Sequence, residues 1–340
     1  MPGVGHLHLH GKLLAFSMLW GWHRVWSAKG MARRRVAVLA GAIHLWSGVS
    51  PSAQTGPLFR SEAALVRVGV TVRDDRGRLV SGLEADDFSV RDRGVVRPIR
   101  QFVSEPAPVS VAVLFDVSGS MEVASRLQAA RLAATALLGA LEPGKDEAAL
   151  LAFDSRLHEV APFTREVRTL NGVLGQMDPF GATSLHDAIA AAAERVAQRT
   201  HPRRAVVVLT DGIDTSSRYT PAEVSGQASA IDVPVYVIAL VLPIDDPASD
   251  RATPQAGRTA PASVGSVADL ARWTGGALRY ASDPLAARRA AREMVDELRH
   301  QYVLGVDALD EPGWHPIEVR TATATHTVRA RGGYVQASRP

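Results

Sequence analysis

Two aspartates and three hydroxyl residues occur where buried strands of this chain are expected to end. The pattern Asp-x-Ser-x-Ser at residues 116–120 follows one apolar run, and Thr-Asp-Gly at residues 210–212 follows another. Between them, a Gly-x-Thr loop precedes a helical pattern. Because ligands of an open parallel sheet bind beyond the carboxyl ends of its strands, we expect these side chains at one edge of the sheet. The candidate site residues are Asp116, Ser118, Ser120, Thr183 and Asp211.

A site built only from carboxylates and hydroxyls favours a hard divalent cation. Mg²⁺ takes about six oxygen ligands at roughly 2.0–2.1 Å and keeps some of its waters. Asp116 and Asp211 would balance the charge of the ion, and the three hydroxyls would supply neutral oxygens. If the carboxylates act mostly through water, the ion stays electrophilic and seeks an anionic ligand. We therefore expect Mg²⁺ as the cofactor, with Mn²⁺ as the alternative ion.

The same residues also have simpler interpretations. Asp116 could cap the end of a strand, and Ser118 and Ser120 could be turn residues. Thr183 or Ser184 could N-cap the helix that follows the Gly-x-Thr loop. Capping by one of these two residues does not exclude metal binding by the other. The metal site is therefore an expectation about the five residues together, not about any one of them.

An enzyme is a further alternative. An Asp at a strand end beside Mg²⁺ could accept a phosphoryl group, as in phosphatases of the haloacid dehalogenase type. Those enzymes use Asp-x-Asp, whereas here Ser118 stands where the general acid would be. No Gly-x-Ser-x-Gly elbow surrounds Ser118 or Ser120, and the chain has no phosphate-binding Gly-x-x-x-x-Gly-Lys-Ser/Thr loop. We expect a protein without enzymatic activity and keep a Mg²⁺-dependent phosphatase as an alternative.

The middle of the chain alternates between apolar runs and helical patterns. Apolar residues follow helical spacing over 123–141 and 185–196. Buried strands that alternate with helices predict an α/β fold with a doubly wound, mainly parallel sheet. The segment 243–266 is rich in Pro, Ala, Ser and Asp and is expected to be a surface insertion without periodic structure. The runs expected to form the strands are residues 109–115, 148–153, 205–209 and 233–242.

Alternating patterns typical of β-strands flank this region. They occur at residues 65–72 and 99–103 on one side and at 302–306 and 327–330 on the other. Each flank is too short to bury a good core alone, so we expect the two to pair into a small β-sandwich module. The expected segments are a leader at 1–53, an N-terminal β segment at 60–106, an α/β domain at 107–300 and a C-terminal β segment at 301–337.

The ordered patterns Asp-x-Ser-x-Ser, Gly-x-Thr and Thr-Asp-Gly resemble the metal-ion-dependent adhesion site of von Willebrand factor type A domains. All five positions match, and the resemblance covers roughly residues 107–300. It implies a Rossmann-like fold. It also implies that three hydroxyl residues bind the metal directly and two aspartates mainly through water, with an Asp or Glu of a protein partner completing the shell. The implied direct ligands are Ser118, Ser120 and Thr183, and the implied water-mediated ligands are Asp116 and Asp211.

The flanking segments extend the resemblance. Val-x-Asp-x-x-Gly-x-x-Val-x-Gly-Leu-x-x-x-Asp-Phe-x-Val at 72–90, Gln-Tyr-Val-Leu-Gly at 301–305 and Val-Arg-Ala-Arg-Gly-Gly-Tyr at 328–334 are similar to segments of exported von Willebrand-type proteins of acidobacteria. The resemblance implies an exported, adhesion-type module that presents Mg²⁺ to an acidic residue of a protein ligand. The alternative is a metal-independent scaffold or assembly protein that acts through its β module.

The first 53 residues have the composition of a targeting segment. From Met31, a charged stretch with three arginines precedes an apolar run at 36–49 and a small-residue segment at 50–54, the order of a signal peptide. We expect translation to start at Met31 and the protein to be exported, to the periplasm or the medium. The run is shorter than the roughly 20 residues that span a membrane, so membrane contact is expected only through an uncleaved leader.

The distribution of charge excludes a nucleic-acid footprint. The chain has 340 residues and a net charge of +3, but six of its 38 basic residues and none of its 35 acidic ones lie in the leader. The remaining chain therefore carries a net charge of −3, and we expect no nucleic-acid partner. The absence of cysteine excludes disulfides and thiolate metal sites, and a hydrophobic fraction of 46% allows a sizeable core.

Overall fold

The computed structural model describes residues 65–179, 181–230, 232–247 and 262–336, all within one compact unit. The expected leader, with its start at Met31, lies outside the described residues. Among the helices that are described, none combines the length and the apolar character that crossing a bilayer requires.

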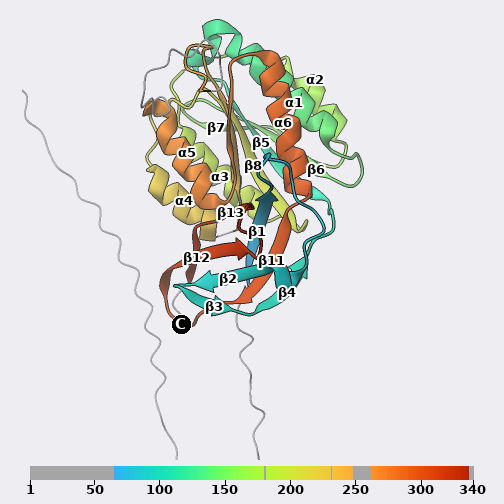
Figure 1. The fold of residues 1–340 in the computed structure, drawn as a ribbon. Coiled ribbons are helices and arrows are strands. Elements are labelled where there is room, and N and C mark those ends of the chain that lie inside the picture. The colour runs from blue at the N-terminus through green and yellow to red at the C-terminus, as the bar shows by residue number, and fades with distance from the viewer. Residues whose placement is uncertain (1–64, 180, 231, 248–261, 337–340) are drawn as a thin grey trace, which may run out of the picture. The chain divides into compact units, whose positions relative to one another are not determined.

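A six-stranded sheet forms the centre of the α/β domain (Figure 1). Its strands are β5 (Val109–Asp116), β6 (Glu147–Phe153), β7 (Leu157–Thr164), β8 (Arg203–Thr210), β9 (Val235–Leu240) and β10 (Leu278–Ala281). In the order β10-β9-β8-β5-β6-β7, all neighbours are parallel except β6 and β7, which are antiparallel. Every residue of β5, β6 and β9 is buried, which explains their nearly unbroken apolar sequences. The expected mainly parallel sheet is confirmed.

Helices cover both faces of this sheet. They are α1 (Arg126–Ala140), α2 (Asn171–Leu174), α3 (Leu185–Ala197), α4 (Pro221–Ala230), α5 (Ala262–Thr274) and α6 (Pro284–Arg299). One core joins the sheet to α1 and α6, with Leu137 and Leu298 almost fully buried. A second core joins the opposite face to α3, α4 and α5 through Ile189, Val224 and Leu270. The doubly wound arrangement is therefore present, and short 3₁₀ turns join several elements: η1 (Ala85–Asp87), η2 (Gly119–Ser125) and η3 (Val167–Leu170).

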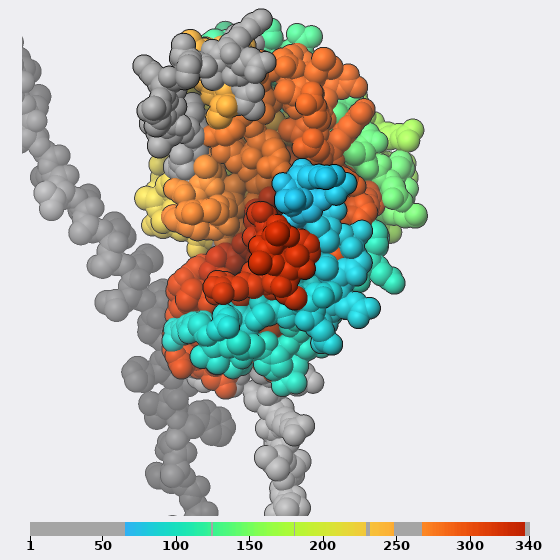
Figure 2. All heavy atoms as spheres, in the orientation of Figure 1, coloured from blue at the N-terminus to red at the C-terminus, as the bar shows by residue number. Residues whose placement is uncertain are grey.

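Segments from both ends of the described chain form a β-sandwich. Its sheets have the orders β13-β1-β11-β4 and β14-β12-β2-β3. One core contains residues of both sheets, among them Val68, Tyr302 and Ile317, so the two flanks do pair as expected. The first strand, β1, pairs antiparallel with β13, and Figure 2 shows the blue and red segments side by side on the surface. Its strands are β1 (Leu65–Arg73), β2 (Phe88–Asp92), β3 (Val95–Arg97), β4 (Ile99–Val103), β11 (Tyr302–Asp307), β12 (Gly313–Thr321), β13 (Thr327–Ala330) and β14 (Gly333–Gln336).

Two local expectations about helices were wrong. Helical spacing predicts a helix from Val123, but η2 occupies that stretch, Val123 is 51% exposed, and α1 begins at Arg126. Ser125 has a positive φ of 64°, which separates the two helical types. Helix α5 begins at Ala262, inside the segment expected to lack periodic structure, while residues 248–261 lie outside the described residues.

The two edges of the parallel sheet face different surroundings. The amino-terminal edge, where β5, β8 and β9 begin, lies against the β-sandwich (Figure 1). There, the Arg203 guanidinium donates to the carbonyl oxygens of Gln301 and Glu105, which flank the domain. The strands then run away from the sandwich, so the carboxyl-terminal edge lies at the opposite end of the domain. That second edge carries the candidate site.

Candidate metal centre

Asp116 is the last residue of β5 and is fully buried. Its Oδ1 accepts the backbone N–H of Ser118 at 2.9 Å, and its Oδ2 accepts the Thr210 hydroxyl at 2.6 Å. The Thr210 Oγ1 also accepts the Gly212 N–H at 3.0 Å. Since β5 and β8 are neighbours in the sheet, the ends of these two strands are tied together through one carboxylate. Asp116 is therefore held by neutral donors.

Ser118 and Ser120 place their hydroxyls side by side. Their Oγ atoms are 3.1 Å apart, and Ser118 is buried while Ser120 is half-buried. The residue between them begins the turn η2, which follows the strand end directly. Two hydroxyl oxygens at this separation can contact one small cation without further backbone movement. The structure thus brings together Asp116, Ser118 and Ser120, as expected.

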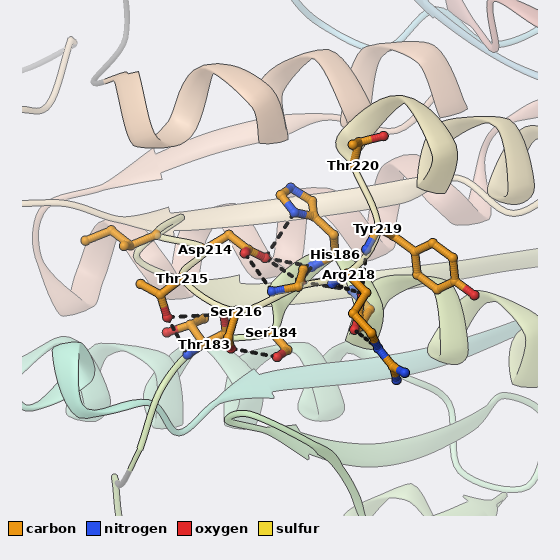
Figure 3. A network of polar contacts seen from close by, with 12 residues as sticks. Thr183, Ser184, His186, Asp214, Thr215, Ser216, Arg218, Tyr219 and Thr220 are labelled. Carbon is orange, nitrogen blue, oxygen red and sulfur yellow. Dashed lines mark hydrogen bonds and ion pairs between the residues drawn. The ribbon is translucent and has the colours of Figure 1, made fainter.

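Thr183 joins this group through backbone contacts. The loop before it turns at Gly181, whose φ of 85° suits glycine, and the Gly181 carbonyl accepts the Gly119 N–H at 3.1 Å. Thr183 is buried; its N–H donates to the Thr215 Oγ1 at 2.9 Å, and its carbonyl accepts the N–H groups of Thr215 and Ser216. Figure 3 shows Thr183 beside Thr215 and Ser216. Three loops, after β5, before α3 and after β8, are therefore held in one place.

The N-terminus of α3 is capped by another loop. Ser184 occupies the N-cap position but makes no capping hydrogen bond; its hydroxyl lies 2.8 Å from the Ser216 hydroxyl. Instead, the His186 N–H donates to the Asp214 Oδ2 at 3.1 Å and to the Ser217 Oγ at 2.9 Å (Figure 3). Capping of α3 by the side chain of its own N-cap residue was therefore a wrong expectation. Capping from the loop after β8 fixes the start of α3 relative to the site.

Asp211 has a cationic partner that the sequence patterns did not indicate. The Arg126 Nη1 lies 2.9 Å from the Asp211 Oδ2 and 3.2 Å from the carbonyl oxygen of Ser120. The Asp211 side chain is 1% exposed and its Oδ1 accepts the Ile213 N–H at 3.2 Å. In the structure, Arg126 is the first residue of α1, where a positive charge opposes the helix dipole, whereas the helical spacing had placed the start of this helix at Val123. A basic residue there needs a nearby carboxylate.

The electrostatics differ between the two aspartates. Burial raises the pKa of Asp116 to about 6, against the lowering effect of hydrogen bonds from Ser118 and Thr210, and the charge of Asp211 raises it further. No Lys, Arg or His nitrogen of the described chain lies within ion-pair distance of the Asp116 carboxylate. A buried carboxylate without a counter-charge is costly, and a cation at this edge would remove that cost.

The donor set fits a hard divalent cation. Two carboxylates and three hydroxyl residues reach the carboxyl-terminal edge from three linked loops, and oxygen ligands are those that Mg²⁺ prefers. Across the described ranges, no group of three or more His, Cys, Asp or Glu side chains could hold a metal ion. Any site at this edge must therefore draw on hydroxyls as well as carboxylates. The residues concerned are Asp116, Ser118, Ser120, Thr183 and Asp211.

A family model matches the part of the chain that contains the candidate site. A model of the von Willebrand factor type A domain matches residues 111–213, which span the three loops of the site. The chain contains a von Willebrand factor type A domain. The resemblance to a von Willebrand factor type A domain is confirmed, as is the Rossmann-like α/β fold, and the metal-ion-dependent adhesion site stays a prediction. Domains of this type are generally protein-interaction or adhesion modules. No curated protein matches the sequence.

Solved structures give weaker likenesses to this von Willebrand factor type A domain protein. BatB, a conserved hypothetical protein from Bacteroides thetaiotaomicron, is 19% identical over 56% of this chain and 98% of its own, with a TM-score of 0.45. A von Willebrand factor type A protein from Catenulispora acidiphila is 14% identical over 82% and 76%, also with 0.45. The corresponding domain of the type V pili tip protein Mfa5 from Porphyromonas gingivalis is 23% identical over 32% and 40%, with 0.30. At these scores we draw no conclusion from the likenesses.

Proposed function

We propose that this protein is an exported module that binds Mg²⁺, or Mn²⁺, at the carboxyl-terminal edge and through it an acidic residue of a protein partner. The observation that carries the proposal is Asp116. Its carboxylate is fully buried, has no cation beside it among the described residues and lies with two paired hydroxyls, Ser118 and Ser120. Burying such a carboxylate destabilises the folded protein unless a cation neutralises its charge.

The roles of the five residues follow from their chemistry. Asp116 and Asp211 supply negative charge, and Ser118, Ser120 and Thr183 supply neutral oxygens. When bound, the ion supplies an electrophilic position that a carboxylate oxygen of the partner can occupy. The loops around the site are fixed by hydrogen bonds from several elements, so the oxygens are preorganised and the binding cost is reduced.

The protein partner would recognise more than the ion. Since a single carboxylate contact gives little selectivity, we assign specificity to the loops after β5, before α3 and after β8, which surround the five residues. Export is proposed on the order of charged, apolar and small residues in the leader. The metal-independent scaffold would instead use the β-sandwich, and no specific contact of that module favours it.

Thermal unfolding tests the metal site. The full chain is melted in EDTA and in millimolar Mg²⁺, as wild type and as Asp116→Ala, Asp116→Asn and the exposed control Asp75→Asn. An ion at about 100 times its dissociation constant adds about 2.7 kcal/mol to the native state. We expect the shift in the wild type and in Asp75→Asn and its loss in both Asp116 variants. An equal shift in all four proteins would refute the site.

The partner step is tested with the same variants. A short peptide that contains one Asp is titrated into the Mg²⁺-loaded protein, and a peptide with Asn in its place is the matched control. We expect binding of the first peptide alone, abolished by EDTA and by Asp116→Asn. Equal binding of both peptides, or binding that survives chelation, would favour the metal-independent scaffold. Release of phosphate from a phosphomonoester that depends on Asp116 would favour the phosphatase.

A further inference from the structure

The amino-terminal edge of the sheet contains a buried positive charge that has no acidic partner among the residues that the structure describes. Arg203 begins β8 and is 2% exposed. Its guanidinium donates only to carbonyl oxygens: to Gln301 from Nη2 at 2.6 Å and Nε at 3.2 Å, and to Glu105 from Nη2 at 2.7 Å. Its Nη1 has no hydrogen-bond partner among the described residues. Buried polar nitrogens of this kind are costly unless something accepts from them.

The charge at Arg203 is not neutralised by its surroundings. No carboxylate of the described residues lies within 4.0 Å of its nitrogens. Burial lowers the pKa of Arg203 to about 10, and the charge of Arg299 lowers it further. A guanidinium with that pKa is still charged at neutral pH. The edge therefore presents a full positive charge with one free donor.

Two adjoining cavities open beside this side chain. The inner one is small, about 20 Å³, and its lining includes Arg203, Arg204 and Arg331. The outer one is about 300 Å³ and is lined by Arg67 and again by Arg204 and Arg331. Asp232 lines both and is the single acidic residue in either lining. Four arginines thus face one aspartate.

The contacts of the lining residues leave this excess charge in place. The Arg204 Nη1 donates to two backbone carbonyl oxygens, and its Nε has no partner among the described residues. The Arg331 Nη1 forms an ion pair with Asp232 at 3.7 Å and the Arg331 Nη2 donates to the Arg67 carbonyl, so the aspartate balances the charge of one arginine. Burial raises the pKa of Asp232, and the charges of Arg331, Arg204 and Arg67 counter part of that rise.

We propose that these cavities form an oxyanion site that binds a phosphate group at the seam between the α/β domain and the β-sandwich. The inner cavity is large enough for one oxygen-sized atom, which would accept from Arg203, and the outer cavity holds the rest of the group. Guanidinium groups match phosphate in charge and in the geometry of their paired N–H donors. The site lies at the sheet edge opposite to Asp116, so the two sites can be tested separately.

The phosphate group that binds here could be free inorganic phosphate or a phosphomonoester on a larger molecule. The outer cavity is open enough for either. A phosphate group at this position would contact β1, β8 and the end of the sandwich together. It would therefore stabilise the seam between the two parts, and unfolding reports its binding.

The test uses the full chain in EDTA, with inorganic phosphate titrated at constant ionic strength and sodium chloride as the matched salt. Binding is followed by calorimetry and by the melting temperature. Arg204→Gln removes one cavity arginine that holds no carboxylate, and Arg320→Gln on β12 is the control because that exposed residue pairs with Glu318 away from the cavities. Arg203→Gln is a second variant, useful if it folds.

We expect phosphate to bind the wild type and Arg320→Gln alike, and Arg204→Gln to bind it at least about tenfold more weakly. Chloride at equal ionic strength should leave the melting temperature unchanged. The proposal is overturned if chloride has the same effect as phosphate, or if Arg204→Gln binds phosphate as tightly as the wild type. O-phosphoserine that competes with phosphate identifies a phosphomonoester as a ligand, and failure to compete identifies free phosphate.

Discussion

The two edges of the parallel sheet hold buried charges of opposite sign. At the carboxyl-terminal edge, Asp116 is buried among hydroxyl and N–H donors with no cation in contact in the described chain. At the amino-terminal edge, Arg203 is buried among carbonyl acceptors, and no carboxylate of the described residues is in contact with it. Each edge therefore contains a charge that the protein holds in position but does not neutralise. Such positions are candidates for binding charged ligands.

Other charges near the amino-terminal edge are neutralised, and these have a structural role. Glu297 on α6 is 1% exposed, accepts a hydrogen bond from Arg73 of β1 at 2.7 Å and forms an ion pair with Arg329 of β13. It thus joins the helix to two strands of the sandwich. Comparison of the two kinds of buried acid shows that burial alone does not distinguish binding residues from structural ones. Asp116 differs from Glu297 in having no cationic partner within ion-pair distance in the described chain, whereas Asp211 of the same candidate site pairs with Arg126.

The largest effect on stability is expected at Glu297. Replacing it with Ala leaves the half-buried arginines around it without this buried carboxylate, which costs up to about 3–5 kcal/mol of unfolding free energy. Urea unfolding at neutral pH measures this. The control is Glu293→Ala on the same helix, where a 51% exposed side chain lies 3.9 Å from Arg279 and should contribute little. Equal losses of unfolding free energy in the two variants would show that the contact of α6 with β1 and β13 does not depend on Glu297.

At Asp116, removing the charge is expected to raise the unfolding free energy, the opposite of the change at Glu297. The folded pKa is about 6 against an ordinary value of 3.8, so the stability associated with the protonated form is complete below pH 3.8 and is lost as pH rises through 6. In EDTA at pH 7, Asp116→Asn removes a cost of up to roughly 3 kcal/mol and should be no less stable than the wild type.

Urea unfolding in EDTA at pH 4, 5, 6 and 7 checks this, and the gain from Asp116→Asn should grow along the series. Asp74→Asn is the control, because a hydrogen bond from the Arg78 backbone N–H lowers the pKa of that half-buried carboxyl. Its stability relative to the wild type should not rise with pH. A strong loss of stability in Asp116→Asn at pH 7 would place Asp116 with the structural acids.

Most of the fold was predictable because buried strands and amphipathic helices leave strong patterns. The runs that form β5, β6, β8 and β9 are long and apolar, since both of their faces are covered. The edge strands β7 and β10 were not predicted. Their residues are mostly half-buried and do not alternate, so neither periodic signal is present.

The candidate site was predictable in its residues but not in its contacts. Asp116 and Asp211 stand at strand ends, and topology brings strand ends to one edge. The contact of Arg126 with Asp211 joins positions 85 residues apart, and the cap of α3 by Ser217 joins positions about 30 apart. No local pattern encodes such contacts, because they depend on where two loops meet after folding.

The loop that caps α3 should show a moderate effect. Ser217→Ala removes the hydroxyl that accepts from the His186 N–H, and we expect a loss of about 1–2 kcal/mol, the usual cost of a lost N-cap. Ser184→Ala is the matched control, since Ser184 holds the N-cap position without a capping bond. Thermal unfolding distinguishes the two. Ser184→Ala also removes the contact of its hydroxyl with Ser216, so an unchanged unfolding free energy in Ser217→Ala is the outcome that would contradict the assignment of the cap to the loop after β8.

The smallest effect is expected at Arg126, and it concerns binding. Arg126 already holds a positive charge 2.9 Å from the Asp211 carboxylate, so a metal ion bound there is repelled. Arg126→Gln should lower the Mg²⁺ dissociation constant about fivefold, equivalent to about 1 kcal/mol. Arg131→Gln, on the same helix but bonded to the Met177 carbonyl, should leave it unchanged. Calorimetric titration measures both. Weaker Mg²⁺ binding in Arg126→Gln would mean that the guanidinium supports the site. The negative charge of Asp211 would then be neutralised by Arg126 and not by a bound ion.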